Sequence, residues 1–114
     1  MKVQVENLAR EQLLDIYYYN LNYSLKNAIE TNYNIRSLIH DLEDSPYIGR
    51  YIPEMSDKRF RELIYKKTKQ SSYRIMYYIS EKSKMIFVFS IMNCKQDFIR
   101  ILKKNNYFNN YINI

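Results

Sequence analysis

The sequence contains few of the residues that form covalent cross-links, tight turns or proton-transfer sites. Its 114 residues include one cysteine, one histidine, one glycine and two prolines. A single cysteine excludes an internal disulfide and suits a reducing compartment, so we expect the protein in the cytoplasm. No histidine or second thiol lies near Cys94 to activate it, and we interpret Cys94 as a small hydrophobic residue at a strand end. His40 points away from the apolar face of its predicted helix, and we assign it no catalytic role.

Long apolar runs and groups of metal ligands are also missing from the sequence. No segment approaches the roughly eighteen uninterrupted apolar residues that cross a bilayer, and the N-terminal segment lacks the apolar stretch of a secretory signal. We therefore expect no contact with a membrane. One histidine and one cysteine fall short of a zinc-binding set, and no carboxylates have the spacing of a calcium loop. We predict that the protein uses no metal, no organic cofactor and no small-molecule substrate.

Charge is divided unequally between the two halves of the chain. The net charge of +6 is the sum of −4 over residues 1–57 (5 Lys and Arg against 9 Asp and Glu) and +10 over residues 58–114 (13 against 3). A basic half of this kind attracts an anionic partner, which is either nucleic acid or an acidic protein segment.

The length and the hydrophobic periodicity predict a single domain over residues 1–114. Period-two alternation predicts strands, whereas apolar residues three and four apart predict helices, with Asn7 and Ser24 as N-caps. Both prolines and Gly49 lie in the main loop, where we expect Gly49 to adopt a conformation closed to residues with a Cβ. The predicted elements are a strand at 2–5, helices at 6–20 and 24–44, strands at 59–65, 73–79 and 85–91, and a short final helix within 94–108.

The order β-α-α-β-β-β predicts an α+β fold, in which an N-terminal helical hairpin covers one face of a small, mostly antiparallel sheet. A short C-terminal helix follows. We expect Arg61 and Arg74 on the face that the helices leave uncovered, because charged residues inside strands are disfavoured without a specific reason. The alternation groups Tyr73, Ile75, Tyr77 and Ile79 on one face, Arg74, Met76 and Tyr78 on the other, and Met85, Phe87, Phe89 and Ile91 on a single face of the return strand.

Three motifs lie in order along roughly residues 3 to 98. One is "LAREQLLDIYYY" on the first predicted helix. A second is the Leu-x-x-x-Pro-x-x-Gly-Arg element in "DLEDSPYIGRYIPE". The third is "RFRELIY" followed by "YRIMYYI" on predicted strands. Together these motifs resemble the RelE/ParE superfamily of toxins from type II toxin–antitoxin modules, whose fold is the β-α-α-β-β-β order derived above.

The resemblance implies a bacterial growth-arresting toxin, of the kind used in plasmid stabilisation, that a cognate antitoxin holds inactive. RelE-like members cleave mRNA on the ribosome, whereas ParE-like members poison DNA gyrase. The helix-rich N-terminal half and the loop "SPYIGRYIPE" are more similar to ParE, so gyrase is the expected target. The candidate contacts with that target are Arg50, Arg61, Arg74, Tyr78, Lys95 and Arg100.

Two alternatives remain open at the level of sequence. A RelE-like, ribosome-dependent endoribonuclease would use Arg61, Arg74 and Glu54, with Glu54 as a base. However, Gln96 stands where such nucleases have arginine, and Arg100 where they have tyrosine. The second alternative is an inactive homologue or a basic nucleic-acid-binding domain. For the strand arginines themselves, pairing with Asp or Glu is the structural interpretation that competes with target binding.

Overall fold

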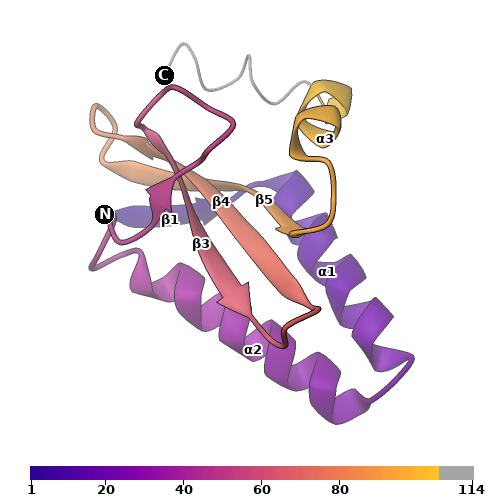
Figure 1. Cartoon of the computed structure of the whole chain (residues 1–114). Helices are drawn as coiled ribbons and strands as arrows, with labels where there is room; N and C mark the ends of the chain where they lie inside the picture. Colours follow the sequence, from indigo (N-terminus) through magenta and orange to yellow (C-terminus); the bar gives the residue numbers. More distant parts are fainter. Residues whose placement is uncertain (106–114) are drawn as a thin grey trace.

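The computed structural model describes the backbone of residues 1–105 and the side chains of residues 1–101. Two helices lie against one face of a five-stranded sheet, and a third, short helix follows the last strand (Figure 1). This arrangement confirms the predicted α+β class. The elements are β1 (Lys2–Val5), α1 (Asn7–Leu21), α2 (Leu25–Asp41), β2 (Arg50–Tyr51), β3 (Phe60–Lys66), β4 (Ser72–Ser80), β5 (Met85–Asn93) and α3 (Phe98–Asn105).

The strands follow the spatial order β1-β5-β4-β3-β2. β1 pairs with β5 in parallel, and all other neighbouring strands are antiparallel, as the prediction of a mostly antiparallel sheet requires. The two-residue strand β2 was not predicted. The part of the predicted final helix at 106–108 lies outside the described residues, as does the side chain of Leu102.

The two long helices begin in different ways. Ser24 caps α2 as predicted, because its Oγ accepts a hydrogen bond of 3.2 Å from the backbone N–H of Asn27. The prediction that Asn7 caps α1 is wrong, since Asn7 is the first helical residue and Glu6 occupies the cap position without a side-chain bond. The cause is strand pairing: the Glu6 N–H donates to the Val88 carbonyl at 2.9 Å, so the extended chain continues to Glu6.

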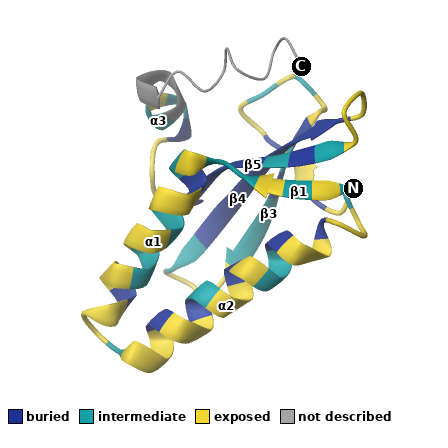
Figure 2. Cartoon of the chain, turned by 180° about the vertical axis from the view of Figure 1, so that it is seen from behind, coloured by how far each residue is buried: buried dark blue, intermediate teal, exposed yellow. Residues whose placement is uncertain are grey.

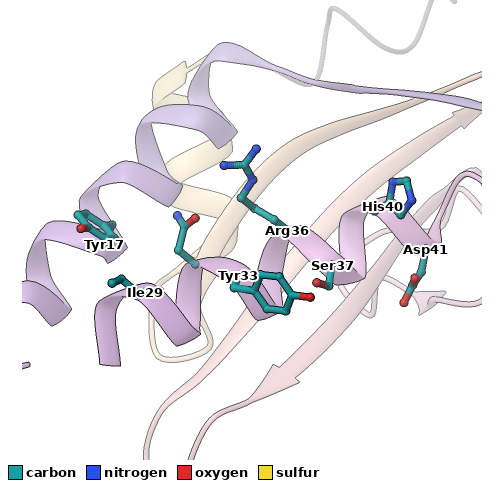
Figure 3. A pocket seen from close by; sticks show the side chains of 8 residues that line it. Tyr17, Ile29, Tyr33, Arg36, Ser37, His40 and Asp41 are labelled. Carbon is teal, nitrogen blue, oxygen red and sulfur yellow. The ribbon is translucent and has the colours of Figure 1, made fainter. Parts of the chain in front are cut away.

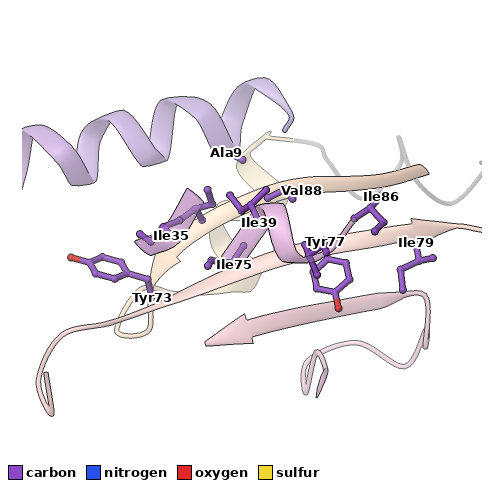
Figure 4. Packing of buried hydrophobic residues seen from close by; sticks show 11 residues of the cluster. Ala9, Ile35, Ile39, Tyr73, Ile75, Tyr77, Ile79, Ile86 and Val88 are labelled. Atoms are coloured by element: carbon purple, nitrogen blue, oxygen red, sulfur yellow. The ribbon is translucent and has the colours of Figure 1, made fainter. Parts of the chain in front are cut away.

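The main core lies between the helical hairpin and the sheet (Figure 4). Apolar residues spaced three and four apart on each helix face the alternate residues of β4 and β5, which explains why both patterns were visible in the sequence. Burying these side chains is the dominant favourable contribution to folding. In Figure 2 the outer faces of both helices are exposed, whereas most of β4 is buried. The cluster comprises Ala9, Ile35, Ile39, Leu42, Tyr73, Ile75, Tyr77, Ile79, Ile86, Val88 and Ile91.

A β-bulge in β5 changes which side chains face the helices. Met76 pairs with Ser90 and Tyr77 pairs with Val88, so Phe89 has no opposite residue on β4. Ile91 consequently faces the helices, and the prediction that it shares a face with Phe87 and Phe89 is wrong. On α1, the side chain of Gln12 accepts hydrogen bonds from the Ile91 N–H at 2.8 Å and the Ser90 hydroxyl at 3.1 Å, which joins that helix to the bulged strand.

The opposite face of the sheet carries a second apolar cluster. It is covered by Ile52 from the loop after β2 and by Phe98 from α3, both buried. The centre of this face is therefore covered, although the sequence predicted it to be open. The cluster comprises Ile52, Phe60, Met76, Tyr78, Phe89, Met92 and Phe98.

Other local predictions have mixed outcomes. Cys94 is exposed just beyond β5, so its interpretation as a hydrophobic residue is wrong, although its place at a strand end is confirmed. His40 lies on the exposed surface of α2, where its Nδ1 is 3.9 Å from a carboxylate oxygen of Glu43. In the described part of the chain, no helix has the length and apolar character that a membrane span requires.

Candidate functional site

Arg74 lies near the start of the central strand β4, on the face away from the hairpin, and is only 7% exposed. Its guanidinium makes three charge-assisted hydrogen bonds to carboxylates. Nη1 and Nη2 donate to the two oxygens of Glu54, each at 2.7 Å, and Nε donates to Oε1 of Glu62 at 2.7 Å. The ring of Phe98 lies on the guanidinium, with its centroid 5.1 Å from Cζ.

Glu62 joins Arg74 to the edge of the sheet. Strand pairing places Glu62 beside Arg50 of β2, and the Arg50 side chain donates to Oε2 of Glu62 from Nε at 2.7 Å and from Nη2 at 2.6 Å. The side chain of Glu62 is 0% exposed, whereas that of Arg50 is 59% exposed. The four side chains Arg50, Glu54, Glu62 and Arg74 therefore form one ion-pair network, which sums to zero formal charge and reaches solvent at Arg50 and Glu54.

The pairing of Arg74 shifts the pKa values of Arg74 and Glu54. Burial alone would lower the pKa of Arg74, but hydrogen bonds to Glu54 and Glu62 outweigh it and raise this pKa above its ordinary value. Hydrogen bonds from Arg74 lower the pKa of Glu54, and they prevail over the opposing effect of burial. Arg74 therefore stays charged, and Glu54 is a weaker base than an ordinary carboxylate.

Arg61 lies on the other face of the sheet, and the prediction that it shares a face with Arg74 is wrong. Arg61 pairs with Tyr77, which faces the helices, whereas Arg74 pairs with Ile64. The Arg61 guanidinium is 4.5 Å from the ring centroid of Tyr51, and its Nη1 donates to the carbonyls of Tyr47 at 3.1 Å and Gly49 at 2.9 Å. Its role here is to hold the loop before β2.

Gly49 is required for a close approach. No glycine in the described chain has a positive φ, so the predicted special conformation is wrong. Instead, a Cβ at Gly49 would lie 2.5 Å from the Tyr77 hydroxyl and 2.6 Å from the Glu62 carbonyl oxygen. The Gly49 N–H donates to this buried hydroxyl at 2.9 Å. The contact positions Arg50, the next residue, beside Glu62.

The remaining predicted contacts are separated in the fold. Tyr78 is 1% exposed and packs on Phe60, with ring centroids 4.9 Å apart, so it supports the face of Arg74 from within the core. Lys95 and Arg100 are exposed near the start of α3. Gln96, which replaces an expected arginine, closes the turn after β5 by accepting a hydrogen bond of 3.0 Å from the Asn93 N–H.

A second surface feature lies along the helical hairpin. A groove of about 650 Å³ is lined by Tyr17 from α1 and by residues along α2, including Tyr33, Arg36 and His40 (Figure 3). Large apolar side chains are exposed on the two helices and on the turn between them. They are Leu14, Tyr18, Tyr19, Leu21, Tyr23, Leu25, Ile29 and Tyr33.

The structure brings together only part of the set of residues that the nuclease interpretation names. Arg74 and Glu54 meet as the nuclease interpretation requires, but they neutralise each other, and Arg61 is elsewhere. Within the described residues, no three His, Cys, Asp or Glu side chains gather into a group that could hold a metal ion. Nothing in the sequence pattern indicates the pairing of Glu54 with Arg74, beyond the general expectation that a strand arginine meets a carboxylate.

Three solved structures have a similar fold. A chain of the chromosomal ParDE system from P. aeruginosa aligns with a TM-score of 0.61 at 18% identity and covers 82% of this chain and 95% of that one. A double arginine-to-alanine mutant of the E. coli toxin RelE in the free state aligns with a TM-score of 0.62 at 11% identity, covering 93% and 96%. The isolated E. coli RelE toxin gives 0.56 at 12% identity, covering 92% and 96%. These similarities show a shared fold.

The family follows from the sequence match. A family model described as the ParE toxin of type II toxin–antitoxin system, parDE, matches residues 3–98, and the chain belongs to this family. A search of curated proteins finds no match. The protein is therefore the toxin component of a type II toxin–antitoxin system, a class whose members pair with an antitoxin.

Proposed function

We propose that this toxin arrests growth by binding and inhibiting DNA gyrase in the cytoplasm, with no chemical step of its own. The observation that carries this proposal is the carboxylate pairing of Arg74. Cleavage of RNA through its 2′-hydroxyl needs a base, an acid for the leaving oxygen and free positive charge. In this structure Glu54 and Arg74 pair with each other, and His40, the only histidine in the sequence, is on a helix that covers the other face of the sheet.

Arginine at the exposed end of the network suits a contact with a protein. Arg50 is oriented by Glu62 while 59% of its side chain remains exposed, and Tyr47, Ile48 and Tyr51 are exposed beside it in sequence. Tyrosine and arginine are the residue types most enriched among the dominant contacts of protein interfaces. We assign the edge formed by residues 47–51 to the gyrase contact.

Two assays with the purified toxin distinguish the targets. We expect inhibition of gyrase-catalysed supercoiling and intact mRNA on translating ribosomes. Arg50→Ala should weaken inhibition by about thirtyfold, because an arginine anchor in an interface contributes ~2 kcal/mol. Lys82→Ala, an exposed cation in the β4–β5 turn, serves as the matched control and should leave inhibition unchanged. Cleaved mRNA together with unaffected supercoiling would assign the protein to the nuclease branch instead.

We propose further that the antitoxin binds along the groove of the helical hairpin and extends to the basic edge of the sheet. Large apolar side chains are exposed on both α1 and α2, where they are available to contact a binding partner. An acidic antitoxin segment would associate faster at low salt, since electrostatic attraction acts mainly on the association rate. Stopped-flow association rates that do not change with salt would contradict the electrostatic part of this proposal.

A further inference from the structure

The outer edge of the Arg74 guanidinium is occupied by a side chain of the protein itself. Glu54, in the loop between β2 and β3, accepts one hydrogen bond of 2.7 Å on each carboxylate oxygen from Nη1 and Nη2. Two parallel bonds of this kind are how arginine recognises a carboxylate on a binding partner. Glu54 thus occupies the position that a bound acidic side chain would take.

Glu54 is also the accessible member of this pair. Its side chain is 32% exposed, compared with 9% for Arg74 and 0% for Glu62. A rotation of the Glu54 side chain into solvent would uncover the outer edge of the guanidinium without opening the core. Because 32% of the Glu54 side chain is already exposed, water can solvate its carboxylate when it rotates away, whereas removing Glu62 would leave a fully buried carboxylate without solvent.

The rest of the network would hold the guanidinium in place after Glu54 leaves. Glu62 still accepts the Nε hydrogen bond, Arg50 still pairs with Glu62, and the ring of Phe98 still supports one side of the guanidinium. Two arginines and one glutamate then sum to a formal charge of +1. A guanidinium that is already held in place, within a group of side chains whose net charge is +1, suits one carboxylate group.

We propose that the outer edge of Arg74 is a carboxylate-binding site, in which Glu54 is an internal occupant that an Asp or Glu side chain of an acidic protein partner replaces. A nucleic acid fits less well, because its binding depends on several cations that contact successive phosphates. This site has one net positive charge, and the ring of Phe98 covers one side of the guanidinium. This proposal does not depend on whether gyrase is the toxin's target.

Nuclear magnetic resonance of the ¹⁵N-labelled protein can test this site directly. The Nε–Hε signal of Arg74 reports on its guanidinium, and a capped pentaglutamate peptide is the probe, with pentaglutamine as the neutral control. In Glu54→Gln the competing charge is removed, and half-saturation should occur at a peptide concentration about tenfold lower than in the unmodified protein. Glu54→Ala should give the same direction of change. Asp57→Asn removes another carboxylate of the same loop, one that pairs with Arg59, and should change nothing.

Each of the other outcomes would overturn the inference. Equal half-saturation in the unmodified protein and in both Glu54 variants would show that Glu54 does not compete for the site. A peptide that never shifts the Arg74 signal would show that the guanidinium does not bind carboxylates from other molecules. A single-stranded hexauridine that shifts the signal where pentaglutamate does not would assign the site to nucleic acid.

Discussion

Replacing Arg74 by methionine tests whether the ion-pair network holds the sheet together. The substitution keeps an apolar stem of similar length but removes three hydrogen bonds of 2.7 Å, and it leaves Arg50 to hold the carboxylate of Glu62, whose side chain is 0% exposed. Breaking a buried ion pair on one side costs roughly 3–5 kcal/mol. Because Arg50 still pairs with Glu62, we expect a loss near the lower end, about 3 kcal/mol.

The double variant Arg74→Met/Glu62→Gln should be more stable than Arg74→Met alone. Once the second charge is neutral, the core no longer contains an ion without its main partner, so the double variant should recover about 1–2 kcal/mol relative to Arg74→Met alone. Both losses are measurable against the ~5–15 kcal/mol that stabilises an ordinary domain.

Denaturation in urea, followed by circular dichroism, gives the free energy of unfolding from the midpoint and the slope. Arg59→Met is the matched control, because Arg59 pairs with Asp57 at 2.7 Å while 48% of its side chain is exposed. Such an exposed pair should cost less than about 1 kcal/mol. Equal losses of stability in Arg59→Met and Arg74→Met would refute the idea that the buried network stabilises the sheet. A double variant less stable than Arg74→Met would refute it too.

Three further predictions follow from other contacts. Gly49→Ala should lower the free energy of unfolding by roughly 1–3 kcal/mol, since its Cβ would lie 2.6 Å from the backbone oxygen of Glu62; an unchanged urea midpoint would contradict this. Ser24→Ala removes the α2 cap and should cost ~1 kcal/mol in the same assay, whereas Ser24→Asp should retain most of the stability. The pKa of Glu54 is lowered by Arg74, so its pairing stabilises the fold above pH 4.5 and is lost as the pH falls through the lowered pKa. Acid unfolding should therefore depend less steeply on pH in Glu54→Gln, and identical profiles would show that the pair contributes nothing.

Local patterns in the sequence predicted those parts of the fold that depend on local physical chemistry. Alternation placed Tyr73 and Ile75 against the helices and Arg74 on the other face, and a serine before an amphipathic run marked the start of α2. These predictions succeeded because side-chain direction follows from a period of two in strands and 3.6 in helices. The network residue Arg50 was predicted as a candidate contact, but its partner was not.

Features that depend on one extra residue or on the path of a loop could not be predicted. The bulge at Phe89 adds a residue that leaves no mark in a hydrophobic pattern, and it moves Ile91 to the other face. Glu54 reaches Arg74 across 20 positions of sequence, through a loop whose course is set by the burial of Ile52. The same holds for the face on which Arg61 lies, which the register with Tyr77 determines.

The pairing of β1 with β5 determines how late in synthesis the sheet can be completed. Residues Lys2–Val5 pair with Met85–Val88, so the first strand to leave the ribosome cannot join the sheet until β5, the last of the described strands, has been made. Contacts this far apart in sequence also slow folding, because a long loop must close before they form. The helical hairpin can assemble from local contacts, but the complete face around Arg74 exists only after synthesis has passed β5.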